Sequence, residues 1–342
     1  MTRTTESLRP DISIDPFRER SRTVARRGMQ ILGAQFDFEC GSRRLLQLVD
    51  AAYAGLPAHR LGSTPPRLLV RLELTSSERS LARRAVPPLD LLSGAGFLCG
   101  ATARSNFVVL APGEGRALIV VPRRMLDYAY LTRYEVIEFA VFTLAQRVQG
   151  LVPLHAACVG RAGRGLLLMG GSGAGKSTLA LHSWLAGFDL LSEDSTFVAA
   201  ASMRATGVAN FLHVRANSLR FLERGVAAMI RRSPVIRRRS GVEKFEVDVR
   251  RRRYPLAAAP LKLDSLIFIS RESAGTGALL APLRESRVME YLVASQPYAS
   301  SLPEWRAFSR NASKLNAFEL RRGRHPQEAV DALQELPGMQ GR

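Results

Sequence analysis

The sequence has few cysteines, no long apolar run and no repeat. Its three cysteines (Cys40, Cys99 and Cys158) are odd in number and widely spaced, which fits neither a disulfide framework nor a zinc site. We therefore expect a reduced, cytoplasmic setting. No apolar run approaches the roughly 18 to 20 residues that cross a bilayer, so no membrane partner is expected. Residues 1–28, rich in arginine and polar side chains, predict a flexible lead-in and not a secretory signal.

Acidic residues are also too few to balance the basic ones. The 342 residues include 49 Lys and Arg but only 30 Asp and Glu, and the net charge is +19. Such an excess favours polyanionic partners, namely nucleotides, nucleic acid, or an acidic protein or peptide. A GC-rich genome, which favours arginine for no functional reason, explains the overall charge equally well. The hydrophobic share of 46% predicts a globular chain with one large domain or two ordinary ones.

Residues 29–150 have the pattern of a strand-rich α+β unit. Alternating or β-branched runs predict strands, and the turn residues Pro112 and Gly113 between two of these runs indicate a hairpin. An apolar stripe at helical spacing then predicts a helix that closes the unit. The expected strands are residues 30–38, 67–74, 106–110 and 117–121, and the expected helix is residues 132–149.

The pattern changes near residue 150, where we place a domain boundary. A compact apolar strand at 165–169 precedes a glycine-rich turn, a helix from 176 to about 186, and a second strand through Leu190 and Leu191. This order predicts a β-α-β unit with parallel strands, within a second domain over residues 151–342. Further strands are expected at 210–214 and 265–269, and further helices at 286–295, 304–314 and 327–336.

The glycine-rich turn fits the phosphate-binding pattern G-x-x-x-x-G-K-[ST] completely. Glycines let the backbone wrap a phosphate with its N–H groups pointing inward, and the following helix presents its positive end to the same anion. A lysine adds charge at the β- and γ-phosphates, and a serine hydroxyl binds Mg²⁺. The pattern therefore predicts an ATP and Mg²⁺ site, and a purely structural glycine turn is the alternative. The predicted site consists of Gly170, Gly171, Ser172, Gly173, Ala174, Gly175, Lys176, Ser177 and Thr178.

Two acidic residues follow the strand that comes after the loop helix. Glu193 and Asp194 come directly after Leu190, Leu191 and Ser192. In a parallel sheet this strand end lies beside the nucleotide. One carboxylate can hold Mg²⁺, and the other can accept a proton from an attacking hydroxyl. Acids at strand ends are common, so a pair of surface acids is the alternative.

These residues together resemble the kinase domain of HPr kinase/phosphorylase and its bacterial relatives. That family has a histidine-bearing strand, then G-x-S-G-x-G-K-S, then a helix and a strand that ends in two acids. Here His155 precedes the loop, and Glu193 and Asp194 end the strand. The resemblance is strong over about residues 151–200 and weaker over 201–330. It implies a P-loop α/β kinase domain, related in fold to ATP-dependent phosphoenolpyruvate carboxykinases, after a smaller α+β domain.

The resemblance also implies roles for individual residues. Lys176 and Ser177 would serve phosphate and Mg²⁺, and Asp194 or Glu193 would hold metal or act as the base. His155 would lie near the transferred phosphate, although by itself it fits a satisfied buried histidine equally well. The family's later E-x-R element has its nearest match at His213 and Arg215, where the glutamate is missing. This departure leaves Arg215 as a phosphate contact.

The implied activity is that of an ATP- and Mg²⁺-dependent serine kinase acting on a small protein or peptide. The N-terminal residues look more like those of HPr-kinase-related proteins that act on other targets, such as lasso-peptide precursor kinases. The acceptor is thus an HPr-like carrier or a precursor peptide. HPr enzymes are hexamers, so the resemblance allows a homo-oligomer. An ATPase or a nucleotide-binding regulator without a protein acceptor remains the alternative.

Residues 231–253 hold nine arginines and one lysine. Such a segment fits a loop that closes over phosphate, a dock for an acidic substrate, or simply a solvated charged loop. Phe245, Val247 and Val249 alternate as in a strand, and Lys244 before them is a candidate phosphate contact. Nucleic acid is not an expected partner, because aromatic residues are sparse and no reading motif is present.

Overall fold

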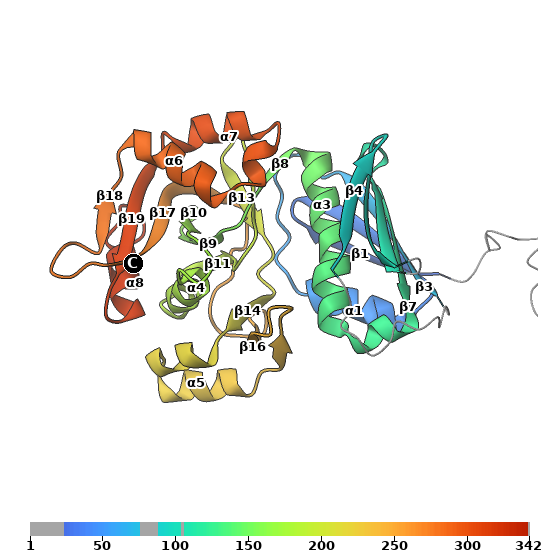
Figure 1. Ribbon diagram of the computed structural model, residues 1–342, viewed down its shortest axis with the longest axis horizontal. Coiled ribbons are helices and arrows are strands. Elements are labelled where there is room, and N and C mark those ends of the chain that lie inside the picture. The colour runs from blue at the N-terminus through green and yellow to red at the C-terminus, as the bar shows by residue number, and fades with distance from the viewer. Residues whose placement is uncertain (1–23, 76–87, 104–105, 341–342) are drawn as a thin grey trace, which may run out of the picture.

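The computed structural model describes residues 24–75, 88–103 and 106–340. The chain is an α/β protein built on several mixed sheets (Figure 1). Residues 1–23 of the expected lead-in lie outside the described part, and its remaining residues contribute to a strand that begins at Ala25. Within the described ranges, no helix is long and apolar enough to cross a membrane.

The first sheet has seven strands in the order β1-β2-β3-β7-β6-β5-β4. Helices α1 (Arg43–Tyr53) and α3 (Glu138–Gln149) share a hydrophobic core with its strands, because alternate strand residues point to the helices. The strands are β1 (Ala25–Ile31), β2 (Ala34–Cys40), β3 (Arg67–Thr75), β4 (Asp90–Gly94), β5 (Phe97–Ala103), β6 (Asn106–Ala111) and β7 (Arg116–Pro122).

One predicted strand of this sheet was wrong in extent. Residues 30–38 are the ends of two antiparallel strands, β1 and β2, joined by a turn at Leu32 and Gly33. Both turn residues have positive φ, 51° and 86°, as a tight two-residue hairpin requires. The alternation of apolar residues continues through the turn, so periodicity alone did not reveal it. The predicted strand at 67–74 and the hairpin of 106–110 with 117–121 are confirmed.

The predicted helix over residues 132–149 is confirmed in extent but not in kind. Its first part is a π-helix, η3 (Thr132–Ile137), and the rest is α3. A π-turn inserts one residue and so changes which side chains face inward. Arg133 is one of the residues buried there, which the regular helical stripe did not predict.

The second sheet has nine strands and contains the predicted β-α-β unit. Strands β10 and β11 both pair antiparallel with β9, so they run parallel to each other with β9 between them. The sequence did not predict this intervening strand. The strands are β8 (Leu151–Leu154), β9 (Ala157–Arg161), β10 (Arg164–Met169), β11 (Asp189–Ser192), β12 (Thr196–Ala199), β13 (Arg204–Gly207), β17 (Leu261–Ser273), β18 (Leu280–Pro282) and β19 (Asn316–Arg322).

Helices cover both faces of the second sheet. Leu166 and Leu168 of β10 face the core formed with α4 (Lys176–Leu185) and α8 (Pro326–Gln334). Leu167 faces the opposite core, formed with α6 (Glu285–Ser295) and α7 (Trp305–Ala312). A strand buried on both faces reads as a continuous apolar run, as residues 165–169 do. The four predicted helices over these segments are confirmed.

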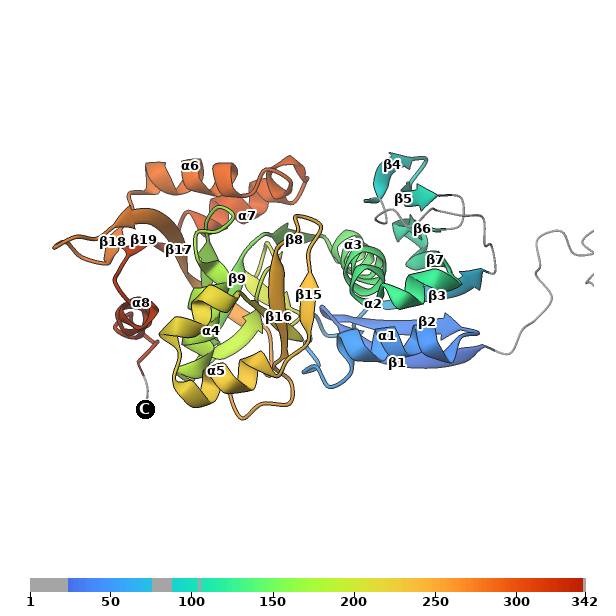
Figure 2. The ribbon, with the colours of Figure 1, turned by 60° about the horizontal axis from the view of Figure 1, so that its bottom comes forward.

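A small three-stranded sheet lies between α4 and the N-terminal helices (Figure 2). It consists of β14 (Phe211–Val214), β16 (Glu243–Asp248) and β15 (Val235–Arg237), and α5 (Arg224–Arg231) precedes β15. The predicted strand at 210–214 is confirmed as β14, and that at 265–269 lies within the longer β17. The arginine-rich segment is therefore largely ordered: it contains both β15 and β16.

Candidate functional site

The glycine-rich loop connects β10 to α4. Gly173 and Gly175 have φ of 78° and 113°, a region that side-chain-bearing residues rarely enter. Gly175 is the N-cap of α4 and supplies no side-chain hydrogen bond, so the first N–H groups of the helix keep their donors for another acceptor. The loop and helix thus form a backbone anion site of the kind that binds phosphates.

Lys176 begins this helix and is only 7% exposed. Its Nζ donates a hydrogen bond to the carbonyl oxygen of Gly170 at 2.6 Å, which closes the lysine back onto its own loop. Burial lowers the pKa of Lys176, and the nearby Asp194 and Glu193 oppose this shift. A phosphate bound in the loop would stabilise the charged form of this ammonium group.

The two acids at the end of β11 occupy different environments. Glu193 is buried, and its Oε2 lies 3.1 Å from Nδ1 of the buried His213 on β14. Burial raises the pKa of Glu193, but His213 and the Ser177 side chain outweigh burial and lower it overall. Its other oxygen, Oε1, is buried without a hydrogen-bond partner among the described residues. Glu193 therefore has one oxygen anchored by His213, and its second oxygen is enclosed.

His213 lies between two carboxylates. Its Nε2 is 3.8 Å from Oε1 of Glu246 on β16. Burial lowers the pKa of His213, whereas Glu193 and Glu246 raise it, and the net shift is upward. The sequence pointed to His213 only as the place of a missing glutamate. The fold instead makes it the partner of the first acid.

Asp194 lies at the open side of the site. Its Oδ1 is 3.3 Å from Nδ1 of His155, and both side chains are about half exposed, at 44% and 52%. Gln296, which is buried, holds the His155 backbone from both sides: its Oε1 accepts from the His155 N–H at 2.7 Å, and its Nε2 donates to the His155 carbonyl. The alternative that His155 is a satisfied buried histidine is wrong, because its ring faces Asp194 and solvent.

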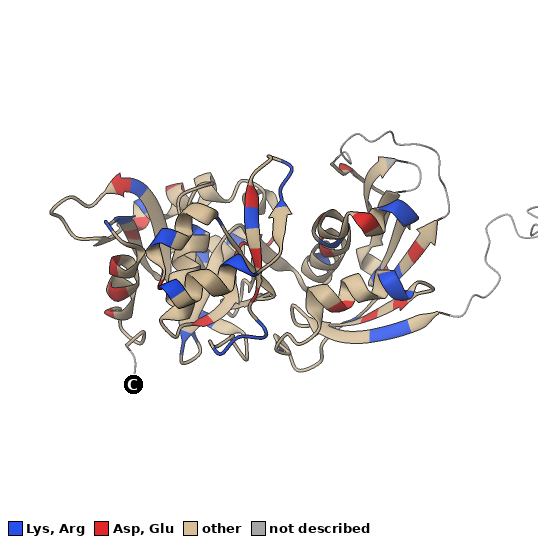
Figure 3. Cartoon of the chain, turned by 90° about the horizontal axis from the view of Figure 1, so that it is seen from below, with Lys and Arg blue, Asp and Glu red and all other residues tan. Residues whose placement is uncertain are grey.

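A cleft of about 540 Å³ connects these groups. Its lining includes His155, Asp194 and the glycine-rich loop, together with Phe221 and His325, whose rings lie edge to face at 5.4 Å. Asp194 is the sole acid among the described residues that line it. Figure 3 marks the Lys and Arg residues of the described chain in blue. The basic lining residues are Lys176, Arg215, Arg220, Arg238, Lys244, Arg271, Arg321, Arg322 and Arg324.

Most of the sequence-predicted site residues line this cleft. Gly170 lies at its edge as the acceptor for Lys176, and Glu193 lies beneath its surface. Thr178 contacts Ser218 across the cleft at 3.5 Å between hydroxyl oxygens. The predicted residues that line the cleft are His155, Gly171, Ser172, Gly173, Ala174, Gly175, Lys176, Ser177, Thr178, Asp194 and Arg215.

Sequence reasoning missed the far wall of the cleft. Arg238 comes from the turn between β15 and β16, and its buried Nε has no hydrogen-bond partner among the described residues. Arg321 to His325 come from the connection between β19 and α8. Only the arginine density around 231–253 signalled any of this, because the cleft brings together segments that are far apart in the sequence.

A metal ion at this site would need ligands beyond the protein. Among the described residues, no three His, Cys, Asp or Glu side chains gather into a cluster that would hold one. Mg²⁺ commonly takes one or two protein oxygens and completes its shell with water and substrate phosphates. Ser177 and the unpartnered Oε1 of Glu193 fit such a set, with Asp194 as a further carboxylate nearby.

The chain was also compared with known proteins. No protein-family model matches it, and no curated protein matches it significantly.

Proposed function

We propose that this protein is an ATP- and Mg²⁺-dependent serine kinase that phosphorylates a small protein or peptide. The observation that carries the proposal is that Asp194 and His155, which are in contact, line the same cleft as the glycine-rich loop. A phosphate-binding loop alone supports nucleotide binding. A carboxylate in the same cleft supports transfer to an acceptor hydroxyl.

In the proposed reaction, the loop N–H groups and Lys176 bind the triphosphate. The acceptor serine oxygen attacks the γ-phosphorus, the bond from that phosphorus to the β-γ bridging oxygen breaks, and ADP leaves. Asp194 accepts the hydroxyl proton, and His155 holds its carboxylate in place at 3.3 Å. Mg²⁺, held by Ser177 and Glu193 with the phosphates, would neutralise charge on the transferred group.

We also propose a fold type for the second domain. A loop, helix, strand and acid in immediate succession support a catalytic domain of the HPr kinase and phosphoenolpyruvate carboxykinase type over residues 151–342. The proposed setting is the cytoplasm, where ATP is abundant.

A nucleotide hydrolase is the second candidate. It is favoured by the half exposure of Asp194, which leaves room for water as the acceptor in place of a serine. The two functions differ in where the γ-phosphoryl group goes.

Transfer from γ-labelled ATP tests the proposal. Wild type and Lys176→Ala are incubated with Mg²⁺ and with serine-containing peptides or an HPr-like carrier protein. The kinase proposal expects label on serine with wild type only. Free phosphate without a labelled acceptor favours the hydrolase, and ATP binding with neither product favours a nucleotide-binding regulator.

A further inference from the structure

A buried polar chain connects the N-terminal part of the protein to the nucleotide loop. Nη2 of Arg133, on the π-helix η3, lies 2.5 Å from Oε1 of Glu246. The same Glu246 oxygen lies 3.8 Å from Nε2 of His213, and Nδ1 of His213 lies 3.1 Å from Glu193. Glu193 in turn adjoins Ser177 of the loop. These contacts connect the π-helix η3 to the glycine-rich loop. The longest step, 3.8 Å between Glu246 and His213, is an ion-pair distance without a hydrogen bond.

Every charged member of this chain is enclosed. The side chains of Arg133, Glu246, His213 and Glu193 are at most 9% exposed. The ring of Tyr134 packs against His213 at 5.2 Å and closes the side that faces the N-terminal helices. Removing one member of a buried ion pair is strongly destabilising, because the other charge is left without compensation. Each carboxylate is thus held in one place by its neighbours.

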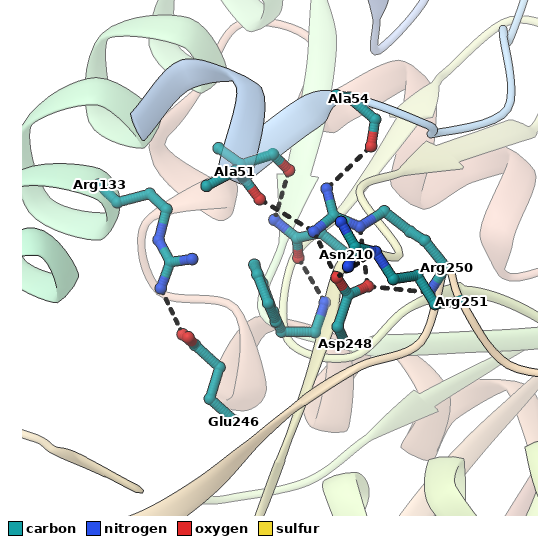
Figure 4. A network of polar contacts seen from close by, with 10 residues as sticks. Ala51, Ala54, Arg133, Asn210, Glu246, Asp248, Arg250 and Arg251 are labelled. Carbon is teal, nitrogen blue, oxygen red and sulfur yellow. Dashed lines mark hydrogen bonds and ion pairs between the residues drawn. The ribbon is translucent and has the colours of Figure 1, made fainter. Parts of the chain in front are cut away.

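The strands that carry this chain are also fastened to the N-terminal part. Asn210 donates to the carbonyl of Ala52, and Arg250 donates to the carbonyls of Ala51 and Ala54 at the end of α1 (Figure 4). Asp248 accepts from the Arg250 guanidinium and keeps it in this position. The small sheet with β14 and β16 is therefore a fixed bridge, with the N-terminal helices on one side and the nucleotide loop on the other.

We propose that Arg133 is a positioning residue for the nucleotide site, which acts through Glu246 and His213 to fix Glu193 for the metal-bound triphosphate. The inference rests on the proposed function, because Glu193 is assigned there to the metal. Arg133 itself is not among the residues that line the cleft. The N-terminal part thus completes the kinase site, in addition to any role in recognising the acceptor.

The test is the double variant Arg133→Met with Glu246→Gln, which removes both charges of the buried pair. A single change leaves one buried charge unpaired and risks misfolding, whereas removing both avoids that penalty. The matched control is Arg239→Met with Glu135→Gln. This ion pair also joins the π-helix to the β15–β16 segment, but its side chains are more exposed, at 31% and 28%.

The readout is ATP binding by calorimetry, measured across a range of Mg²⁺ concentrations and without Mg²⁺. Residues that support metal ligands typically contribute 10- to 100-fold in metal affinity, so the double variant should need about tenfold more Mg²⁺ for half-maximal binding. Its metal-free ATP binding should stay within about twofold of wild type, as should all binding by the control. Arg133→Lys, which keeps the charge but not the planar fork, should give an intermediate value.

A double variant with the Mg²⁺ requirement of wild type contradicts this inference and leaves the proposed function intact. Equal weakening of metal-free and metal-dependent binding also contradicts it, since that pattern reports general damage. If the double variant does not fold, Arg133→Lys is tested in its place. An unchanged Mg²⁺ requirement in Arg133→Lys then contradicts the inference. Wild type that binds no ATP contradicts the proposed function itself.

Discussion

The ammonium of Lys176 is bonded to the carbonyl oxygen of Gly170, six residues back on the same loop, at 2.6 Å. The lysine is therefore buried and satisfied before any ligand enters. A triphosphate must replace this carbonyl as its partner or share it. The new hydrogen bond would be stronger than the old one, because its acceptor would be an anionic phosphate oxygen in place of a neutral carbonyl oxygen.

Replacing Lys176 by Met should weaken ATP binding by about tenfold or more, the size of a lost charge-assisted hydrogen bond. Thermal stability without nucleotide should change little, because a buried ammonium with a lowered pKa gives way to an apolar group of similar length. Calorimetric titration with ATP measures the first effect. Lys262→Met is the control, since Lys262 also donates to a backbone carbonyl, that of Ser202, outside the cleft. If the two variants bind ATP equally well, Lys176 does not bind the triphosphate.

The two acids should respond differently to neutralisation. Asp194→Asn removes the proposed proton acceptor and should lower kcat by about 100- to 10,000-fold, with ATP binding near that of wild type. Glu193→Gln should instead raise the Mg²⁺ concentration needed for binding, because Glu193 lies beneath the cleft beside Ser177. Steady-state kinetics and metal titrations separate the two. Identical profiles for both variants would contradict the division of roles.

Phe221 and His325 line the cleft with their rings edge to face at 5.4 Å. We expect the nucleoside base to stack there, because these rings lie in the same cleft as the glycine-rich loop. Base stacking on an aromatic ring is worth about 1 to 3 kcal/mol, so Phe221→Ala should weaken ATP and ADP alike by about tenfold. Inorganic triphosphate serves as the competitor without a base. If its binding falls by the same factor, the base lies elsewhere.

Glu138, at the start of α3, makes stability depend on pH. Burial raises its pKa from 4.5 to about 8, despite the nearby His213 and Arg133. Between these values the unfolded chain ionises this carboxyl while the folded chain keeps it protonated. Stability is therefore lost as pH rises through that window. Glu138→Gln should raise the melting temperature relative to wild type by more at pH 9 than at pH 5, by at least about 2 °C. If the difference in melting temperature between the variant and wild type is the same at both pH values, Glu138 does not have a raised pKa in the folded protein.

Local elements of the fold were predictable from the sequence. The loop, the helix from Lys176 and the strand ending before Glu193 follow from glycine placement and apolar runs that lie within 25 residues of one another. The strand at 165–169 was predictable because both of its faces are buried, which gives a continuous apolar run in the sequence. The turn at Leu32 and Gly33 was missed, because the alternation of apolar residues continues through it.

Long-range partners were not predictable. The strand order that inserts β9 between β10 and β11, and the pairing of Glu193 with His213, depend on chain crossings that leave no local signal. Arg133 is the clearest case: in the sequence it is one arginine in an amphipathic helix. Only the π-turn and the approach of β16 give it a buried partner 113 residues away.

The most direct test of the kinase proposal is a count of ADP and phosphoserine formed together, with wild type and Asp194→Asn, on peptide and HPr-like acceptors. The account predicts one phosphoserine for each ADP with wild type. Both products should fall by at least about 100-fold in Asp194→Asn, while ATP binding is kept. ADP formed without phosphoserine on any acceptor, or phosphoserine formed at the wild-type rate by Asp194→Asn, would contradict it.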